Sequence, residues 1–175
     1  GVRVYLHEMK PLKYSAAHKN PDFAELVCSN SLRSDDFEHN AVGLMHQEMR
    51  LAGSLIMACA DATKVPAGGA LAVDRDGFAK LVSEKIRSHP FIDIIEGEIT
   101  ELPDEAAGDT IIATGPLTSE ALAQSILKHI DNQALSFYDA IAPVVFKDSI
   151  NFEKAWYQSR YDKGDKFDYI NCPMN

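Results

Sequence analysis

Short apolar stretches with the period of a β-strand alternate with longer stretches of helical spacing over the first two thirds of the chain. Val2–His7 alternates apolar and polar side chains, as in a half-buried strand. Ala41–Ala60 and Gly77–Ser88 repeat apolar residues every three or four positions, which predicts helices. Asp109–Ala113 predicts a buried strand that ends in a turn at Gly115. This order favours an α/β fold, in which ligands bind at the carboxyl ends of parallel strands.

The rest of the chain divides into two parts that differ in composition and in hydrophobic pattern. Phe91–Ile95 and Glu98–Leu102 are short strand candidates, and Ser119–Ile130 predicts one more helix. Beyond that helix aromatic residues become dense and short strand candidates replace helical patterns. We therefore expect a domain boundary that separates residues 1–116 from residues 117–175.

The stretch Glu25–Ser34 has the composition of a binding loop. It combines the thiol of Cys28 and the guanidinium of Arg33 with four small polar residues. Serine and asparagine side chains bond to nearby backbone groups and so favour loops over helices. The small polar residues are Ser29, Asn30, Ser31 and Ser34. Such a loop presents a thiol to a ligand, although a surface turn with one buried cysteine has the same composition.

The three cysteines are odd in number, widely spaced and free of any Cys-x-x-Cys pair. The spacing argues against a disulfide framework or a zinc site, and it favours a reducing compartment. Cys59 falls on the apolar stripe of the helix predicted over Ala41–Ala60, so we expect it in the core. His46 lies near the edge of the same stripe and is expected to be a partnered surface histidine.

The formal charge of −9 argues against nonspecific attraction to nucleic acid. RNA binding through one end of the chain, or through other parts of a longer protein, stays open. No run approaches the roughly 20 apolar residues that cross a bilayer, and no signal sequence is visible. We therefore expect a cytoplasmic protein without a membrane partner.

Two positions match the places where an α/β sheet contacts a nucleotide. Glu8 follows the strand Val2–His7, and a carboxylate at such a strand end can accept hydrogen bonds from both ribose hydroxyls. Ala113, Thr114 and Gly115 end the strand predicted over Asp109–Ala113, where a ligand would contact them. The simpler interpretations are that Glu8 is a solvated carboxylate and that Gly115 belongs to a turn without a ligand.

Four blocks of sequence, in order along the chain, resemble the bacterial folate- and FAD-dependent tRNA uracil-5-methyltransferases, the TrmFO family. The blocks are Glu25–Ser34, Val65–Arg75, Ile111–Ser119, and Ser159–Gly164 together with Asn171–Met174. The resemblance implies part of a Rossmann-like FAD-binding domain of the glutathione-reductase type, followed by the start of a mixed α+β insertion domain. The glycine-rich FAD motif that precedes the first of these blocks in the family is not in the sequence, so we expect an internal fragment.

The resemblance also implies roles for individual residues. Cys172 would add to C6 of uracil, and Cys28 would serve as base or as a flavin-side partner. The residues expected to bind cofactor are Glu8, Lys10, Ser29, Asn30, Ser31, Arg33, Ala113, Thr114 and Gly115. The family takes its carbon from methylenetetrahydrofolate, uses FAD as carrier and NADPH or NADH as reductant, and acts on a uridine in the T-loop of tRNA. No metal is expected.

Two other functions stay open from the residues themselves. A flavin-dependent oxidoreductase of glutathione-reductase type would share the strand end at Glu8 and the turn at Gly115, but it gives no reason for two separated reactive thiols. The other alternative is a nucleotide-binding module that catalyses no reaction. The oligomeric state, the choice of nicotinamide and the order of roles between the two thiols are not determined by the sequence.

Overall fold

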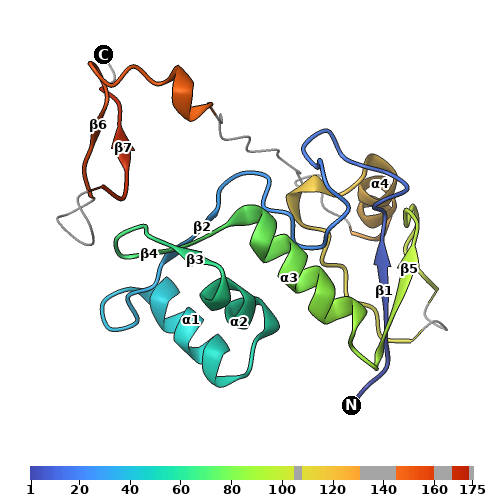
Figure 1. Ribbon diagram of the computed structural model, residues 1–175. Coiled ribbons are helices and arrows are strands. Elements are labelled where there is room, and N and C mark those ends of the chain that lie inside the picture. Colours follow the sequence, from blue (N-terminus) through green and yellow to red (C-terminus); the bar gives the residue numbers. More distant parts are fainter. Residues whose placement is uncertain (105–107, 131–144, 160–166, 174–175) are drawn as a thin grey trace. The chain divides into compact units, whose positions relative to one another are not determined.

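The computed structural model describes residues 1–104, 108–130, 145–159 and 167–173. The chain forms two compact units, each discontinuous in sequence. Unit 1 comprises Gly1–Pro21 and His89–Ile141, and unit 2 comprises Asp22–Ser88 and Ala142–Asn175. Helices occur together with a parallel strand pair, which confirms the predicted α/β class (Figure 1).

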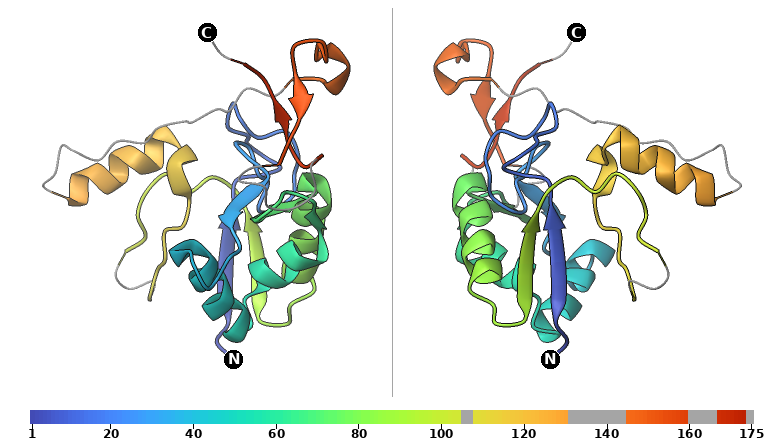
Figure 2. Two further views of the ribbon diagram at one scale, coloured as in Figure 1. Left: turned by 90° about the vertical axis from the view of Figure 1, so that its left-hand side faces the viewer. Right: turned by 90° about the vertical axis from the view of Figure 1, so that its right-hand side faces the viewer.

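Unit 1 is built on two parallel strands, β1 (Val4–Glu8) and β5 (Ile92–Glu96). They pair in register from Val4 opposite Ile92 to Glu8 opposite Glu96, and they run side by side in both views of Figure 2. The Gly97 N–H continues the ladder by donating to the Glu8 carbonyl at 2.9 Å. Both strands were predicted from the sequence within two residues of their ends.

Helix α4 (Glu120–His129) belongs to unit 1. The Ser119 hydroxyl caps it by accepting from the Leu122 N–H, as expected for a serine at this position. Ser125 is buried on the inner face of the helix and accepts from the Leu102 N–H at 3.0 Å. This bond holds the segment after β5 against the helix.

Two predicted strands of unit 1 are absent from the structure. Asp109–Ala113 has no regular structure, and Ile111 in its middle is 90% exposed. A strand forms only where a neighbour satisfies its backbone groups, and no described segment pairs with these residues. Glu98–Leu102 is also irregular, because its groups bond elsewhere: the Glu98 carboxylate accepts from Lys13 Nζ at 2.6 Å, and the Leu102 N–H bonds to the Ser125 hydroxyl.

Unit 2 combines a three-stranded antiparallel sheet with three helices. The strands are β2 (Ser31–Ser34), β3 (Lys64–Val65) and β4 (Ala70–Val73), in the order β2-β4-β3. The helices are α1 (Ala41–Leu51), α2 (Leu55–Ala62) and α3 (Arg75–Arg87). Helix α2 packs against α3 and β4. The largest fully buried side chains lie at this contact and are Met57, Cys59, Leu71, Val73, Phe78 and Val82.

The single helix predicted over Ala41–Ala60 is wrong, because the chain breaks between α1 and α2. Gly53 takes a φ of 73°, in the left-handed region that glycine accepts without strain. The Ser54 hydroxyl then accepts from the Met57 N–H at 3.4 Å and starts α2. The break also misplaces the expected apolar stripe, since Met45 is 49% exposed and His46 occupies the buried face of α1.

The C-terminal part of unit 2 is a short hairpin. A 3-10 turn, η3 (Lys147–Ser149), precedes β6 (Trp156–Tyr157), which pairs antiparallel with β7 (Ile170–Asn171). The Tyr169 hydroxyl donates to the Ala67 carbonyl at 2.6 Å, so the hairpin is bonded to the turn between β3 and β4. This agrees with the short strands expected beyond the last helix.

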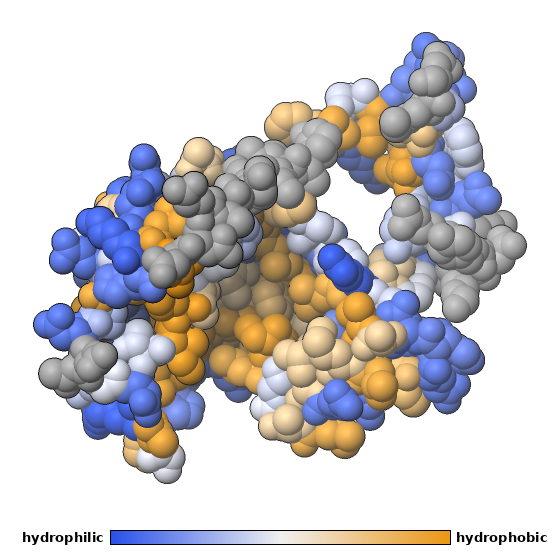
Figure 3. Space-filling model, turned by 180° about the vertical axis from the view of Figure 1, so that it is seen from behind, coloured by the Kyte–Doolittle hydropathy of each residue, from blue (hydrophilic) through white to orange (hydrophobic). Residues whose placement is uncertain are grey.

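Much apolar surface is exposed on both units. Figure 3 shows apolar residues in orange over a wide area of one face. Among the exposed large side chains are Val4 and Tyr5 of β1, Ile95 of β5 and Phe146. Parallel strands usually carry apolar residues on both faces, and other elements of the fold cover both faces. The exposed apolar residues of β1 and β5 are of the kind that such elements cover.

The packing of α1 gives a test of the fold. A Cβ added at Gly43 would lie 2.2 Å from the Asp36 carbonyl oxygen, a backbone atom that cannot move aside. We expect Gly43→Ala to destabilise the protein by about 1–3 kcal/mol through overpacking, measured as the free energy of unfolding in urea.

Gly77→Ala is the matched control. Its Cβ would approach only the carboxylate of Asp74, at 2.6 Å, and a side chain can rotate away. Alanine also favours a helix over glycine by about 1 kcal/mol, so this variant should be at least as stable as the wild type. Equal stability of the Gly43 and Gly77 variants would contradict the packing described for α1.

Candidate functional site

The stretch Glu25–Ser34 is a loop that becomes a strand. Residues 25–30 have no helix or strand, as predicted, whereas Ser31–Ser34 form β2 beside β4. The strand was missed because its register is irregular, with Arg33 at a φ of 74° between the two paired positions. Local bonds of the expected kind hold the chain: the Ser29 hydroxyl accepts from the Ser31 N–H, and the Ser31 hydroxyl from the Arg33 N–H, both at 3.1 Å.

Asn30 fastens this loop to the sheet. Its side-chain amide donates to the Val73 carbonyl at 2.9 Å, and its own carbonyl accepts from the Val73 N–H at 3.0 Å. The Asn30 amide group is therefore engaged in holding the loop. Asn30 thus has a structural role, in addition to the cofactor contact expected from the sequence.

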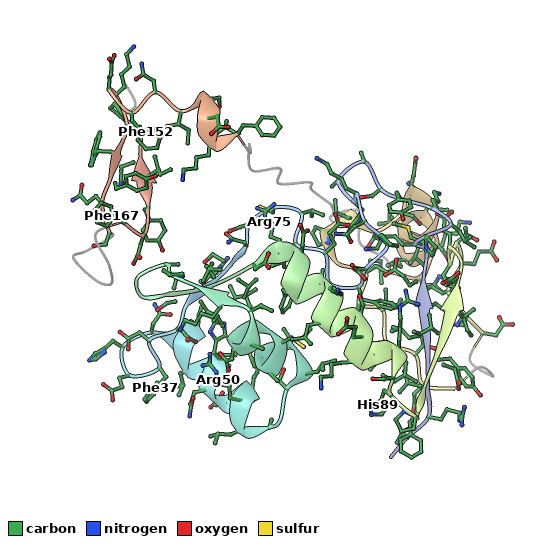
Figure 4. The ribbon with its side chains drawn as sticks, viewed as in Figure 1. Phe37, Arg50, Arg75, His89, Phe152 and Phe167 are labelled. Carbon is green, nitrogen blue, oxygen red and sulfur yellow. The ribbon has the colours of Figure 1, made fainter. Side chains whose placement is uncertain are left out.

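Cys28 lies on the exposed side of the loop as a free thiol. Arg75, the first residue of α3, donates from Nη2 to the Cys28 carbonyl at 3.3 Å and is marked in Figure 4. A guanidinium is thus bonded to the backbone of the cysteine itself. The sequence reasoning had named Arg33 as the cation near this thiol and did not identify Arg75.

The end of the loop is fixed by a network centred on Asp35. The Asp35 carboxylate accepts from Arg50 Nη2 at 2.9 and 3.1 Å, lies 3.1 Å from His46 Nδ1, and accepts from Lys64 Nζ at 3.3 Å. Arg50 also donates to Asp61 at 2.7 and 2.9 Å, which extends the network to α2 (Figure 4). The carboxylate thus contacts α1 and β3 at once.

The electrostatics of this network follow from its geometry. Burial on its own raises the pKa of Asp35, but the hydrogen bonds from Arg50 and His46 outweigh burial and the pKa is lowered overall. The hydrogen bond from Arg50 likewise lowers the pKa of Asp61. His46 is only 4% exposed, so the expectation of a surface position is wrong, although the expected partner exists. The spacing of His46 and Arg50, four residues apart on one helix, was the signal that could have revealed the network.

The nucleotide-binding residues expected in unit 1 lie at and after the end of β1. Glu8 is half-buried, and its Oε1 accepts from the Lys10 N–H at 3.0 Å. Lys10 is 4% exposed. The carboxylate is therefore held at the carboxyl end of a parallel strand, where ligands bind in α/β sheets.

Ala113, Thr114 and Gly115 are exposed; the first two precede the 3-10 turn η2 (Gly115–Leu117), and Gly115 begins it. The Thr114 hydroxyl lies 2.6 Å from the Thr118 hydroxyl, which donates to the Gly115 carbonyl at 2.7 Å. The turn predicted at Gly115 is present, with a φ of 67°. The strand expected before it is not.

Cys172 follows β7 and is an exposed free thiol. It lines an open pocket of about 270 Å³ together with the polar residues Ser149, Asn151 and Lys154. Both exposed thiols, Cys28 and Cys172, belong to unit 2, whereas Glu8, Lys10 and Gly115 belong to unit 1. Three cations precede Cys172 in the sequence, Arg160, Lys163 and Lys166, and they lie outside the described residues.

Metal clusters and membrane-spanning helices are both absent from the described residues. No group of three or more His, Cys, Asp or Glu side chains there is arranged to hold a metal ion. No helix in those parts of the chain is long and apolar enough to cross a membrane.

The Asp35 network predicts how the loop responds to loss of its anchor. Asp35→Asn removes the charge that holds Arg50 and His46, at a cost of about 1–3 kcal/mol to local stability. Hydrogen exchange of residues 28–35 at pH 7 should therefore become faster, by about tenfold for each 1.4 kcal/mol. Glu48→Gln, at an exposed position of α1, is the control and should leave exchange unchanged.

The same network predicts a pH dependence. Because the folded pKa of Asp35 is lowered, its contribution to stability is present above the unfolded pKa of about 3.9 and is lost as the pH falls through the folded pKa. Protection of residues 28–35 should decline in acid in the wild type and decline less in Asp35→Asn. An identical acid response in the two proteins would contradict the network.

Comparison with known proteins shows what the chain is similar to. It is 60% identical to proteins of Brucella anthropi, Brucella ovis and Brucella melitensis, each named methylenetetrahydrofolate–tRNA-(uracil-5-)-methyltransferase TrmFO. The matches cover 100% of this chain and 38% of each relative, so the chain spans well under half of their length. The family model described as GIDA, glucose inhibited division protein A, matches residues 1–175. The chain therefore belongs to the glucose inhibited division protein A family.

Proposed function

We propose that the protein containing this chain is a folate- and FAD-dependent tRNA methyltransferase that forms 5-methyluridine in the T-loop. The identity of 60% over the whole chain to relatives that carry the name of this activity is the observation on which the proposal rests. The two exposed thiols of unit 2 supply the chemistry that the reaction requires.

The chemistry of uracil explains the need for two thiols. C5 of uracil is a poor nucleophile until a thiolate adds to C6 and converts the ring to an enolate. The enolate then attacks a one-carbon electrophile at C5, and a base removes the C5 proton so that the thiolate can leave. We assign the addition to Cys172 and the base, or a flavin-side role, to Cys28.

Exposure separates these thiols from the third one. Cys59 is 1% exposed, and burial raises the pKa of its thiol. It therefore stays protonated and cannot reach a substrate. Cys28 and Cys172 are both exposed, and the Arg75 guanidinium lies at the Cys28 backbone.

Residues of unit 1 fit the adenosine end of FAD. Glu8 presents a half-buried carboxylate at the carboxyl end of β1, oriented by the Lys10 N–H, as ribose recognition requires. Bound FAD would carry the one-carbon unit and supply reducing equivalents. In unit 2, Ser29, Ser31 and Arg33 would contact the cofactor from the loop that Asn30 fastens to β4. Lys10, Ala113, Thr114 and Gly115 complete the proposed cofactor contacts.

Other parts of the proposal concern the whole protein. We propose methylenetetrahydrofolate as carbon donor, NADPH or NADH as reductant, and the cytoplasm as the compartment, where tRNA is the substrate. We also keep the functional division into residues 1–116, which bind FAD, and 117–175, which belong to a substrate domain. The compact units of the structure group the chain differently, because they follow contacts and not function.

The cysteine variants test the proposal in the full-length protein. Cys172→Ala should abolish 5-methyluridine formation in tRNA while flavin reduction by nicotinamide persists, because that reduction needs no thiol adduct. Cys28→Ala should also abolish methylation but still allow a covalent uracil adduct through Cys172. Nucleoside analysis of the tRNA by mass spectrometry and flavin absorbance measure the two activities.

Cys59→Ala is the matched control. It removes a buried sulfur and should cost about 1–2 kcal/mol of stability with methylation near normal. Methylation by Cys172→Ala, or loss of methylation in a folded Cys59→Ala, would overturn the assignment. Flavin reduction without methylation in the wild type, given folate donor and tRNA, would favour a plain flavin-dependent oxidoreductase.

Glu8 gives a separate test of the cofactor site. Glu8→Ala leaves the ribose hydroxyls without an acceptor, at a cost of about 1–3 kcal/mol. The affinity of the full-length protein for FAD should fall by about 5- to 150-fold, measured by fluorescence titration of the apoprotein. Glu96→Ala, at the paired position of β5, is the control; an equal effect of both changes would exclude a specific role for Glu8.

A further inference from the structure

The pocket beside Cys172 is built from two short pieces of chain, residues 145–155 and residues 172–173. Its wall comprises the turn η3, the residues that lead into β6, and the residues that follow β7. The pairing of Trp156 with Asn171 brings Ala155 next to Cys172, and both line the pocket. Ala155 is 6% exposed and contributes an apolar surface to the pocket.

Apolar and polar residues contribute in equal number to the lining. Val145, Ile150, Ala155 and Pro173 are apolar, and Ser149, Asn151, Lys154 and Cys172 are polar. Lys154 contributes the one ammonium group among these lining residues. The turn that carries it is fixed, because the Lys154 and Ala155 N–H groups both donate to the Asn151 carbonyl at 3.0 Å, and the Asn151 Oδ1 accepts from the Glu153 N–H at 2.8 Å.

The size of the pocket limits its occupant. About 270 Å³ is below the roughly 300–1,000 Å³ usual for sites that enclose a drug-sized ligand. A pteridine with its glutamate-bearing arm, or a dinucleotide, needs more room. A single pyrimidine ring fits this volume, and a pocket that combines apolar side chains with hydrogen-bonding groups can enclose an extruded base.

We propose that this pocket holds the uracil ring of the target nucleotide and that Lys154 stabilises the negative charge that forms on it. The inference rests on the proposed function, in which Cys172 attacks C6. In that step the Sγ–C6 bond forms, the π electrons of C5=C6 move through C4, and the charge of the thiolate comes to rest on O4. No proton, oxidant or further reactant is needed.

The position of Lys154 suits this role for an electrostatic reason. An ammonium in the same pocket as the nucleophile favours the anionic state of the adduct over the neutral ring that precedes it. A hydrogen bond to O4 also withdraws electrons from C6 and makes the ring more reactive toward a thiolate. Phosphate binding by Lys154 would aid only tRNA affinity, so the two roles predict different measurements.

The test uses the full-length enzyme and a T-loop RNA that contains 5-fluorouracil, which keeps the covalent adduct from breaking down. Lys154→Met should slow adduct formation at saturating RNA by about 100- to 1,000-fold, the range for loss of one donor at a developing oxyanion. Lys154→Arg should recover part of the rate. Lys147→Met, an exposed lysine of η3 that does not line the pocket, should match the wild type.

Two results would overturn the inference. If Lys154→Met forms the adduct at the wild-type rate under saturation but binds RNA less tightly with a smaller salt dependence, Lys154 contacts phosphate and the inference is overturned. A second variant, Ile150→Trp, fills the pocket; it should block adduct formation and leave flavin reduction by nicotinamide unchanged. A wild-type adduct rate in that variant would also overturn the inference.

Cys172→Ala, run in parallel, separates this inference from the proposed function. An adduct in Cys172→Ala would mean that the assigned nucleophile is wrong. A different result would overturn only the pocket assignment: Cys172→Ala forms no adduct, while Lys154→Met and Ile150→Trp both form it at the normal rate. The assignment of Cys172 as nucleophile would then stand.

Discussion

The Asp35 carboxylate is the interaction on which the loop carrying Cys28 depends. It receives hydrogen bonds from Arg50 and Lys64 and pairs with His46, and its own N–H donates to the Gly69 carbonyl at 2.9 Å. One residue at the end of β2 is thereby bonded to α1, to β3 and to the turn before β4. Removing the charged donors from a partly buried carboxylate costs free energy. The contacts of Asp35 therefore hold the chain before and after it in one arrangement.

This anchoring suits the catalytic role proposed for the exposed thiol of Cys28. Loops carry most functional residues because they reach solvent, but they need a rigid support. Here the support comes from both sides of Cys28: Asp35 fixes the chain after it, and Arg75 bonds to its carbonyl. Asn30 adds two bonds to β4. The thiol itself stays exposed, whereas Cys59 fills the core between α2 and α3.

A structural feature could be predicted from the sequence where it depends on residues close together in the chain. The strand β1, the helix α4 and the buried Cys59 follow from periodicity, and all were predicted. The break at Gly53 was missed because apolar residues continue through it at helical spacing. The strand expected over Asp109–Ala113 was wrong because strand formation depends on a pairing partner, which local sequence does not reveal.

The candidate site shows the same limit. Composition identified the loop around Cys28, and the resemblance to a known family identified Cys172. The contacts of Asp35 with His46, Arg50 and Lys64 join residues 11 to 29 positions apart, so the local spacing of His46 and Arg50 on α1 does not identify Asp35 as their partner. The pocket beside Cys172 arises only when β6 pairs with β7 and brings Ala155 to the cysteine.

The most direct test of the account is to identify the residue that bonds to the substrate. The wild-type full-length enzyme would be incubated with folate donor, reduced nicotinamide and 5-fluorouracil-containing T-loop RNA, digested, and mapped by tandem mass spectrometry. The account predicts a pyrimidine on the peptide that contains Cys172 and none on the peptide that contains Cys59. A modified Cys59, or a nucleotide joined to Cys28 with Cys172 unmodified, would contradict it.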